Sequence, residues 1–336
     1  MTSRGGASLR TGAVAALRVS RAQAVSYRLA VNNLSSRLPA GCYVQAAFAG
    51  LQDTAPRDAL LGLHARVAAC EPSAWQHPGL IQTYSPRAAV YLLPAGDLGV
   101  FTIGRLPRDP QQRQILEDLA EQTCRALDGQ EARGSTLPLR AACATGRIAV
   151  RWTTSALYVR EHPRPSIDPE TARLELCRRH LHAFGPSTAA AFGWWAGVTA
   201  RDARTTFDLL ADELTPVDLA GQQAWALAAD ESALRTAEPM RGVRLLVTPD
   251  LRLLGQDRTG LFVGPGKNDH SPLQDWFHPN GLLVDGRVVG AWGRRGGLVT
   301  IKAAGSLTPA DRQAIHAEAA SLPIPNADVT VSLTEH

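Results

Sequence analysis

Acidic residues are missing from the first part of the chain: none precedes Asp53. The same stretch holds six arginines, namely Arg4, Arg10, Arg18, Arg21, Arg28 and Arg37. Lysine is scarce throughout, because Lys267 and Lys302 are the only lysines among 35 cationic residues. Arginine presents a fixed fork of donors that matches phosphate oxygens, so this pattern favours a polyanionic partner. A charged tail, or the arginine bias of a GC-rich genome, explains the composition equally well.

Long apolar runs are missing too. No stretch approaches the roughly 18 to 20 consecutive apolar residues that a membrane span requires. The first residues lack the charged-then-apolar order of a secretion signal. We therefore expect a cytoplasmic, nucleoid-associated protein with no membrane partner. With 336 residues, 45% of them hydrophobic, the chain can bury the cores of two or three domains.

Motifs for metal and nucleotide binding are also missing. The five cysteines are odd in number and form no Cys-x-x-Cys pair, which indicates reduced thiols and no zinc cluster. His180 and His182 would point about 200° apart on a helix, which does not suit one metal. Residues 264–267 lack the spacing of a phosphate-binding loop. We expect no metal and no cofactor.

Helix caps, turn residues and apolar periodicity indicate an α+β chain in which groups of helices alternate with strand pairs. The first group comprises helices over residues 20–39, 43–51 and 56–69, followed by a hairpin of strands 88–93 and 100–103. The second comprises helices 110–128 and 137–145 and strands 147–152 and 156–159. The third comprises helices 169–184, 187–196 and 200–212 and strands 214–219 and 224–227. Strands at 241–247, 281–284 and 288–292, a helix at 308–321 and a strand near residue 329 complete the chain. The Asp285-Gly286 pair that joins two of these strands predicts a type I′ hairpin turn.

Residues 50–67, which read GLQDTAPRDALLGLHARV, resemble the LGLQAQxPRAAxLALWARV signature of the AlkZ/YcaQ DNA glycosylases, winged-helix proteins that remove alkylated bases. Segments at 178–201, 247–258 and 281–295 resemble the same family, so the resemblance spans about residues 18–322. It implies three tandem winged-helix units around a concave basic DNA channel, with a C-terminal β-rich region. We place the three units at residues 18–107, 108–165 and 166–230, and the C-terminal region at 231–336.

The same resemblance implies a catalytic site in the first of these segments. In the family, a glutamine and a second polar residue two positions on form the catalytic pair. The aligned trio is Gln52, Asp53 and Thr54, so the second glutamine is replaced by threonine and an aspartate stands at a usually apolar position. A neutral amide can orient water without bringing a charge close to DNA phosphates. Asp53 is either a base that compensates for the lost glutamine or an N-cap of the next helix, a role that Thr54 can share.

The candidate DNA contacts are Arg28, Arg57, Arg87, Tyr91, Arg258, Arg294 and Arg295. Arg87 and Tyr91 align with the arginine and histidine of the family's RGTLH segment, where an arginine binds phosphate and a ring wedges against a base or lesion. The alternatives are arginines that are only solvated, a Tyr91 that belongs to the core, and an ordinary hairpin turn at residues 294–297.

We therefore predict a monofunctional DNA glycosylase that hydrolyses the N-glycosidic bond of purines alkylated at N7 or N3. No lysine lies near Gln52 in the sequence, so a Schiff-base lyase would lack its nucleophile. The substrates would include bulky natural-product adducts or interstrand crosslinks, removed in base excision repair and antibiotic self-resistance. The partner would be double-stranded DNA with alkylated bases, bound by a monomer. The alternative is a non-catalytic winged-helix DNA-binding protein, a regulator or lesion binder, in which Thr54 marks a lost activity.

Overall fold

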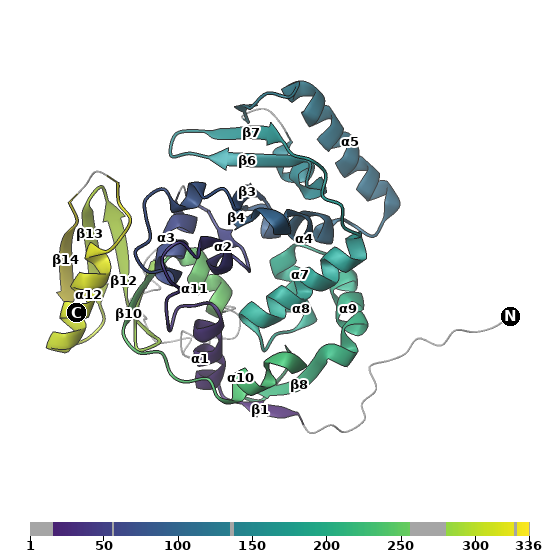
Figure 1. The fold of residues 1–336 in the computed structure, drawn as a ribbon. Coiled ribbons are helices and arrows are strands. Elements are labelled where there is room, and N and C mark those ends of the chain that lie inside the picture. Colours follow the sequence, from purple (N-terminus) through teal and green to yellow (C-terminus); the bar gives the residue numbers. More distant parts are fainter. Residues whose placement is uncertain (1–15, 56, 135–137, 256–279, 326–327, 336) are drawn as a thin grey trace.

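The computed structural model describes residues 16–55, 57–134, 138–255, 280–325 and 328–335. In these residues, helices α1 to α12 and strands β1 to β14 form a mixed α+β architecture with three sheets (Figure 1). No helix in this part of the chain is long and apolar enough to cross a membrane.

The largest sheet joins strands from the first two predicted units in the order β2-β4-β3-β6-β7-β5. Its strands are β2 (Leu51–Gln52), β3 (Leu80–Tyr84), β4 (Val90–Pro94), β5 (Ala132–Arg133), β6 (Ile148–Trp152) and β7 (Leu157–Glu161). The two groups of strands meet where Gln82 of β3 pairs with Val150 of β6. Helix α5 (Pro110–Leu127) runs beside β7, and the short α6 (Leu139–Ala142) follows it (Figure 1). Strand β2, which carries Gln52, therefore lies at one edge of a sheet shared by both units.

A layer of helices packs against this sheet. It contains α1 (Arg21–Val31), α4 (Leu98–Thr102), α7 (Pro169–Phe184), α8 (Ala189–Ala196), α9 (Ala200–Leu209), α10 (Glu231–Arg235) and α11 (Thr248–Gly255). A three-stranded sheet of β1 (Leu17–Val19), β8 (Leu214–Leu219) and β9 (Gln222–Leu227) borders it. Strand β1 pairs in parallel with β8, so the start of the described chain joins the third predicted unit.

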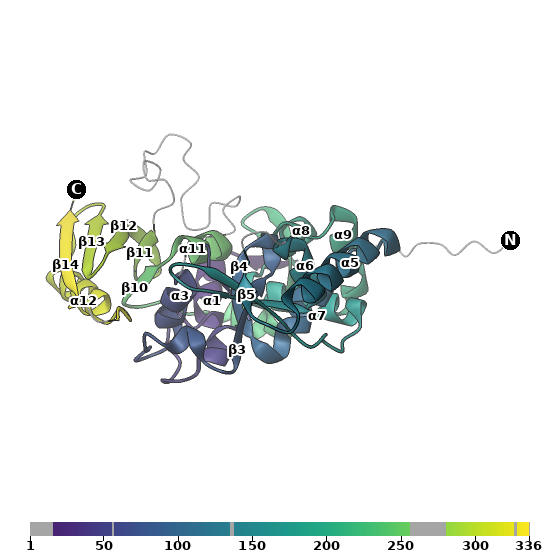
Figure 2. The ribbon, with the colours of Figure 1, turned by 90° about the horizontal axis from the view of Figure 1, so that it is seen from above.

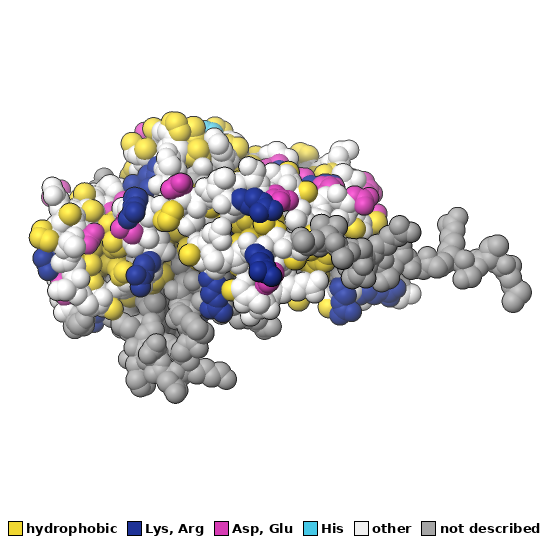
Figure 3. All heavy atoms as spheres, turned by 90° about the horizontal axis from the view of Figure 1, so that it is seen from below, with side chains coloured by type: hydrophobic (Ala, Val, Ile, Leu, Met, Phe, Trp, Pro, Cys, Tyr) yellow, Lys and Arg dark blue, Asp and Glu magenta, His cyan; other side chains and the backbone are white. Residues whose placement is uncertain are grey.

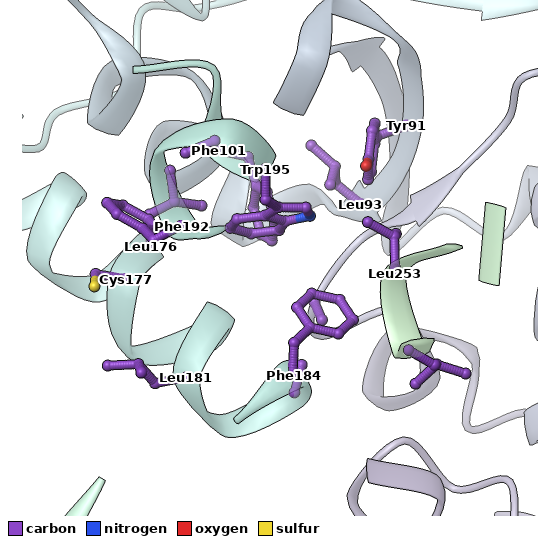
Figure 4. Packing of buried hydrophobic residues seen from close by; sticks show 14 of the residues in the cluster. Tyr91, Leu93, Phe101, Leu176, Cys177, Leu181, Phe184, Phe192, Trp195 and Leu253 are labelled. Atoms are coloured by element: carbon purple, nitrogen blue, oxygen red, sulfur yellow. The ribbon is translucent and has the colours of Figure 1, made fainter. Parts of the chain in front are cut away.

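The main hydrophobic core lies between this layer and the largest sheet, around Trp195 (Figure 4). The Trp195 ring is 1% exposed and lies edge-on to Phe101 and Phe184, with ring centroids 6.4 and 5.7 Å away. Tyr91 and Leu93 of β4 close the core on the sheet side (Figure 4). Because these aromatic side chains bury large areas, the core sets the position of β4 and of the strands paired with it.

The C-terminal region is a sheet in the order β10-β11-β12-β13-β14 covered by one helix, and it lies at one end of the molecule (Figure 2). Its elements are β10 (Val243–Leu246), β11 (Asn280–Val284), β12 (Arg287–Arg295), β13 (Leu298–Ala303), α12 (Pro309–Ala320) and β14 (Thr330–Glu335). The turn between β11 and β12 has φ of 48° at Asp285 and 75° at Gly286. Positive φ at both positions is the requirement of the expected type I′ hairpin, so this prediction is confirmed.

The first predicted hairpin is wrong in its second strand. Residues 100–103 lie in α4 and the 3-10 turn that follows it, and β4 pairs instead with β3. Val100, Phe101 and Ile103 are all buried, so tertiary packing outweighs the strand preference of these side chains. The helices around the motif are also shorter than expected, because α2 spans Tyr43–Ala46 and α3 spans Asp58–Arg66. Pro56, the expected first residue of the third helix, lies outside the described residues.

Arg28 connects α1 to α11 and to the end of α7 within the helical layer. Its guanidinium is fully buried and donates to the carbonyl oxygens of Gly185, Pro186 and Leu254 at 3.1, 2.9 and 2.7 Å. Burial lowers the pKa of Arg28 to about 9. The prediction that Arg28 binds DNA phosphate is therefore wrong, because the side chain cannot reach the surface. It acts instead as a buried crosslink between α1, the end of α7 and α11.

Replacing this crosslink tests its role. Arg28→Ala should lower the free energy of unfolding by about 3 kcal/mol or more, since three buried carbonyls each lose a donor. Urea denaturation followed by circular dichroism measures the change. Arg235→Ala is the control, because Arg235 is exposed and pairs with Glu231 on the same short helix; its cost should be below about 1 kcal/mol. Equal costs for the two variants would contradict the crosslinking role.

Candidate active site

The backbone places Gln52 at the sheet edge through a turn that requires glycine. Gly50 has φ of 75°, and a Cβ there would meet side-chain atoms of Leu93 and Tyr91 at 2.8 and 2.9 Å. The chain then enters β2, which runs antiparallel to β4 with Gln52 opposite Tyr91. The close approach at Gly50 therefore sets the register that brings the Gln52 and Tyr91 side chains together.

Two hydrogen bonds orient the Gln52 amide. Its Oε1 accepts from the Tyr91 hydroxyl at 3.2 Å, and its Nε2 donates to Thr54 Oγ1 at 2.5 Å. Gln52 is half-buried and Thr54 is exposed, so this pair opens to solvent. No other group in the described part of the chain bonds to this amide, which leaves it one lone pair and one N–H, the groups needed to hold a water molecule. The structure thus brings together Gln52 and Thr54 of the predicted trio.

Tyr91 supports Gln52 from the hydrophobic core. Its side chain is fully buried, and burial raises the pKa of its phenol well above the usual range, so the hydroxyl remains a donor. The expectation that Tyr91 contacts a base or lesion directly is corrected here: the ring lies in the core, and only the hydroxyl reaches the site. Sequence reasoning missed this positioning role, although the pairing of two polar residues across adjacent strands is a signal that can be sought.

Asp53 points into the protein, away from Gln52 and Thr54. Its side chain is 1% exposed, with Oδ1 accepting from the backbone N–H of Ala59 and Oδ2 from Gln82 Nε2, both at 3.0 Å. Ala59 lies in the first turn of α3, so Asp53 satisfies an N-terminal donor of that helix from outside it. Burial raises the pKa of Asp53 to about 6, against the lowering effect of the Ala59 bond. These contacts favour the helix-capping alternative for Asp53.

Arg57 and Asp58 form the junction between the motif and α3. Arg57 has φ of 86°; its guanidinium donates to the Trp152 carbonyl at 3.0 Å and lies 3.6 Å from the centre of the Trp75 ring. Asp58 is half-buried, and its Oδ2 accepts from the backbone N–H of Ala55 at 3.0 Å. Burial raises the pKa of Asp58 to about 6. Sequence reasoning assigned Asp58 no role, although it lies next to the motif.

Of the other candidate DNA contacts, Arg87 lies on a different element from Arg294 and Arg295. Arg87 is half-buried in a 3-10 turn, with its guanidinium 4.1 Å from the centre of the Trp194 ring. Arg294 and Arg295 are exposed at the end of β12, and Arg258 lies outside the described residues. On the face shown in Figure 3, Lys and Arg side chains lie in small separate groups among neutral and acidic ones. Among the described residues, no group of three or more His, Cys, Asp or Glu side chains could hold a metal ion.

A comparison with protein families gives a match over just over half of the chain. The family model for AlkZ-like DNA glycosylases matches residues 138–323. The chain belongs to the AlkZ-like family of DNA glycosylases. The matched span lies after Gln52 in the sequence, so family membership rests on the second half of the chain and leaves the roles of Gln52, Asp53 and Thr54 to the geometry above.

One curated protein and one solved structure are similar to the chain. The interstrand DNA cross-link repair glycosylase of Streptomyces sahachiroi is 32% identical over 130 residues, which cover 37% of this chain and 35% of the relative. The alignment thus spans about a third of that protein. The solved structure of the Streptomyces sahachiroi DNA glycosylase AlkZ is 18% identical, with a TM-score of 0.72 over 95% of this chain and 100% of that one. At this identity the structural match establishes a shared fold.

The raised pKa of Asp53 has a consequence for stability. A carboxyl group whose pKa is higher in the folded state binds more protons there between about pH 4 and 6, so the protein loses stability as pH rises through that window. Asparagine cannot ionise. The free-energy cost of Asp53→Asn should therefore fall by about 2 to 3 kcal/mol between pH 4 and 7.

Urea denaturation at several pH values measures this cost. Asp118→Asn is the control, because Asp118 is exposed on α5 and accepts a bond from Gln114 of the same helix; its cost should stay within about 0.5 kcal/mol of zero at each pH. A cost for Asp53→Asn that stays constant or grows toward pH 7 would contradict a buried, proton-binding Asp53.

Proposed function

We propose that this protein is a monofunctional DNA glycosylase that hydrolyses the N-glycosidic bond of purines alkylated at N7 or N3. The observation that carries the proposal is the half-exposed Gln52 amide, which Tyr91 and Thr54 hold in one orientation in a chain of the AlkZ-like family. Glycosylase chemistry needs such a fixed polar group beside the sugar, because a positioned dipole costs no reorganisation during the reaction.

Removal of an alkylated purine suits a neutral residue that orients water. Alkylation gives the purine a positive charge, so the base leaves readily and needs little acid catalysis. The enzyme must hold a water molecule on the opposite face of the sugar as positive character develops at C1′. Gln52 can orient that water through its amide, and Thr54 supplies a hydroxyl at 2.5 Å from the amide nitrogen. Thr54 thus takes the place of the second glutamine at shorter reach.

The absence of a suitable lysine in the sequence supports hydrolysis over a lyase reaction. A Schiff-base mechanism needs an amine nucleophile at C1′. Lys267 and Lys302 are the only lysines, and neither is near Gln52 in the sequence. Lys302 belongs to β13 of the C-terminal sheet, a different sheet from that of Gln52, and Lys267 lies outside the described residues.

The name of the curated relative suggests a substrate class. That protein repairs interstrand DNA cross-links, and we extend this to bulky adducts and crosslinks as substrates of this chain, in base excision repair and self-resistance to a DNA-alkylating natural product. The partner is double-stranded DNA, bound by a monomer with Arg57, Arg87, Arg294 and Arg295 as phosphate contacts. Three winged-helix units around a basic channel remain part of the proposal.

Base release by site variants tests the function. The full chain is incubated with duplex DNA carrying N7-methylguanine or a bulky N7-guanine adduct, and abasic sites are counted after alkaline cleavage. Gln52→Ala should lower kcat/KM about 100-fold, since one positioned group is lost from the transition state. Thr54→Ala should lower it about tenfold, which is the loss of about 1.4 kcal/mol.

Gln114→Ala is the matched control, because Gln114 is an exposed glutamine on α5; its rate should equal that of the wild type. If the wild type releases no base from any adduct, small or bulky, yet binds the DNA, the protein is a non-catalytic DNA-binding member of the family. The replacement of the second glutamine by Thr54 is the observation that favours this second candidate.

A further inference from the structure

Asp58 is a second carboxylate beside the Gln52–Thr54 pair, and the family signature has alanine at its position. We propose that Asp58 is the general base of the site and accepts a proton from the water that Gln52 and Thr54 orient. The inference rests on the proposed glycosylase function and assigns the proton transfer that the lost second glutamine leaves open.

The backbone holds the Asp58 carboxylate against the N–H of Ala55, the residue that follows Thr54. Its Oδ2 accepts from the N–H of Ala55, and the Asp58 N–H donates to the Ala55 carbonyl, both at 3.0 Å. Ala55 directly follows Thr54 in the chain. The two bonds therefore hold the Asp58 carboxylate beside the backbone of the residue next to Thr54. Thr54 and Ala55 are exposed, and a water molecule can reach this side of the motif.

Asp58 differs from Asp53 in what its oxygens contact. Both oxygens of Asp53 accept hydrogen bonds inside the protein, and its side chain is 1% exposed. Asp58 is half-buried, its Oδ1 accepts no hydrogen bond from the residues that the structure describes, and it forms no ion pair with them. Of the two carboxylates, only Asp58 therefore has an oxygen available to a water molecule.

The charges around Asp58 favour a base that works near neutral pH. The negative charge of Asp250 raises the pKa of Asp58, but Arg66 holds Asp250 through two bonds of 2.8 Å and offsets that charge. Asp53 is the other acidic neighbour, and the Arg57 guanidinium is turned onto Trp75. With burial raising its pKa to about 6, Asp58 is mostly ionised at pH 7 and more basic than an exposed carboxylate.

Proton transfer to Asp58 accompanies cleavage of the N-glycosidic bond. The bond between C1′ and the purine nitrogen breaks, and its electron pair neutralises the cationic base, which leaves as a neutral molecule. The water oxygen forms the new bond to C1′. Its proton passes to the free oxygen of Asp58, and later to bulk water, so no other reactant is needed.

A pH–rate profile of two isosteric variants tests the assignment. Single-turnover base release from N7-methylguanine duplex DNA is measured with the full chain between pH 5 and 8. The wild-type rate should fall about tenfold per pH unit below the pKa of the base. Asp58→Asn should remove this acidic limb and lower the plateau about 100-fold, the usual contribution of a positioned base. Its amide oxygen can still accept from Ala55, so DNA affinity and the circular dichroism spectrum should not change.

Asp53→Asn tests whether Asp53 is the base instead of Asp58, and Asp118→Asn on α5 is the surface control. The reaction rate of both variants should still fall at low pH as in the wild type. If Asp58→Asn reacts at the wild-type rate and its rate still falls at low pH, Asp58 is not the base, and the glycosylase proposal stands. The same conclusion follows if only Asp53→Asn loses the fall in rate at low pH. No release by the wild type overturns both proposals. If Asp58→Asn does not fold, Asp58→Ala is assayed with added formate: recovery of the rate supports a lost base, and no recovery refutes it.

Discussion

The hydrogen bond from the Tyr91 hydroxyl to Gln52 Oε1, at 3.2 Å, connects the candidate chemistry to the hydrophobic core. Tyr91 packs in the same cluster as Trp195, Phe101 and Leu93 (Figure 4), and this cluster joins the largest sheet to α4, α7 and α8. The two-residue strand β2 is too short to hold its own position, so its register depends on β4 and on the close approach at Gly50. The orientation of one half-exposed amide thus follows from the packing of residues that are distant in sequence.

The same geometry shows what surrounds the threonine that stands where the family signature has its second glutamine. Thr54 bonds directly to the Gln52 amide, and the carboxylates of Asp53 and Asp58 occupy different environments within a short stretch of chain. Asp53 satisfies the first turn of α3 and Gln82 in the interior, while Asp58 has an oxygen free beside the exposed residues. This difference in burial and contacts gives Asp53 a structural role and is the basis for the chemical role proposed for Asp58.

Local signals in the sequence were sufficient for elements whose ends are set by neighbouring residues. Four of the expected helices are capped by the side chain of the residue before their first turn, namely Ser20, Asp109, Asp168 and Thr308. The Asp285-Gly286 turn has the expected positive φ angles. These features depend on residues at most three positions apart, which a sequence displays directly.

Features that depend on distant contacts were not predictable in this way. Residues 100–103 have strand-forming side chains but lie in a helix, because the core buries them on all sides. In the sequence, Arg28 has the features of a surface cation. Only the fold shows that α1 places it against the carbonyl oxygens of residues 185, 186 and 254. For the site, the resemblance pointed to Gln52 and Thr54, which a hydrogen bond joins in the structure. The inward turn of Asp53 and the support from Tyr91 could be seen only in the three-dimensional fold.

The rate of base release by Tyr91→Phe tests most directly whether the core positions the amide for chemistry. Phenylalanine keeps the ring in the core and removes only the donor to Gln52. Single-turnover release from N7-methylguanine DNA should be about tenfold slower, with unchanged DNA affinity and with Tyr158→Phe, on β7, behaving as the wild type. An unchanged rate in Tyr91→Phe would contradict the account, because the orientation of Gln52 would then not matter for the reaction.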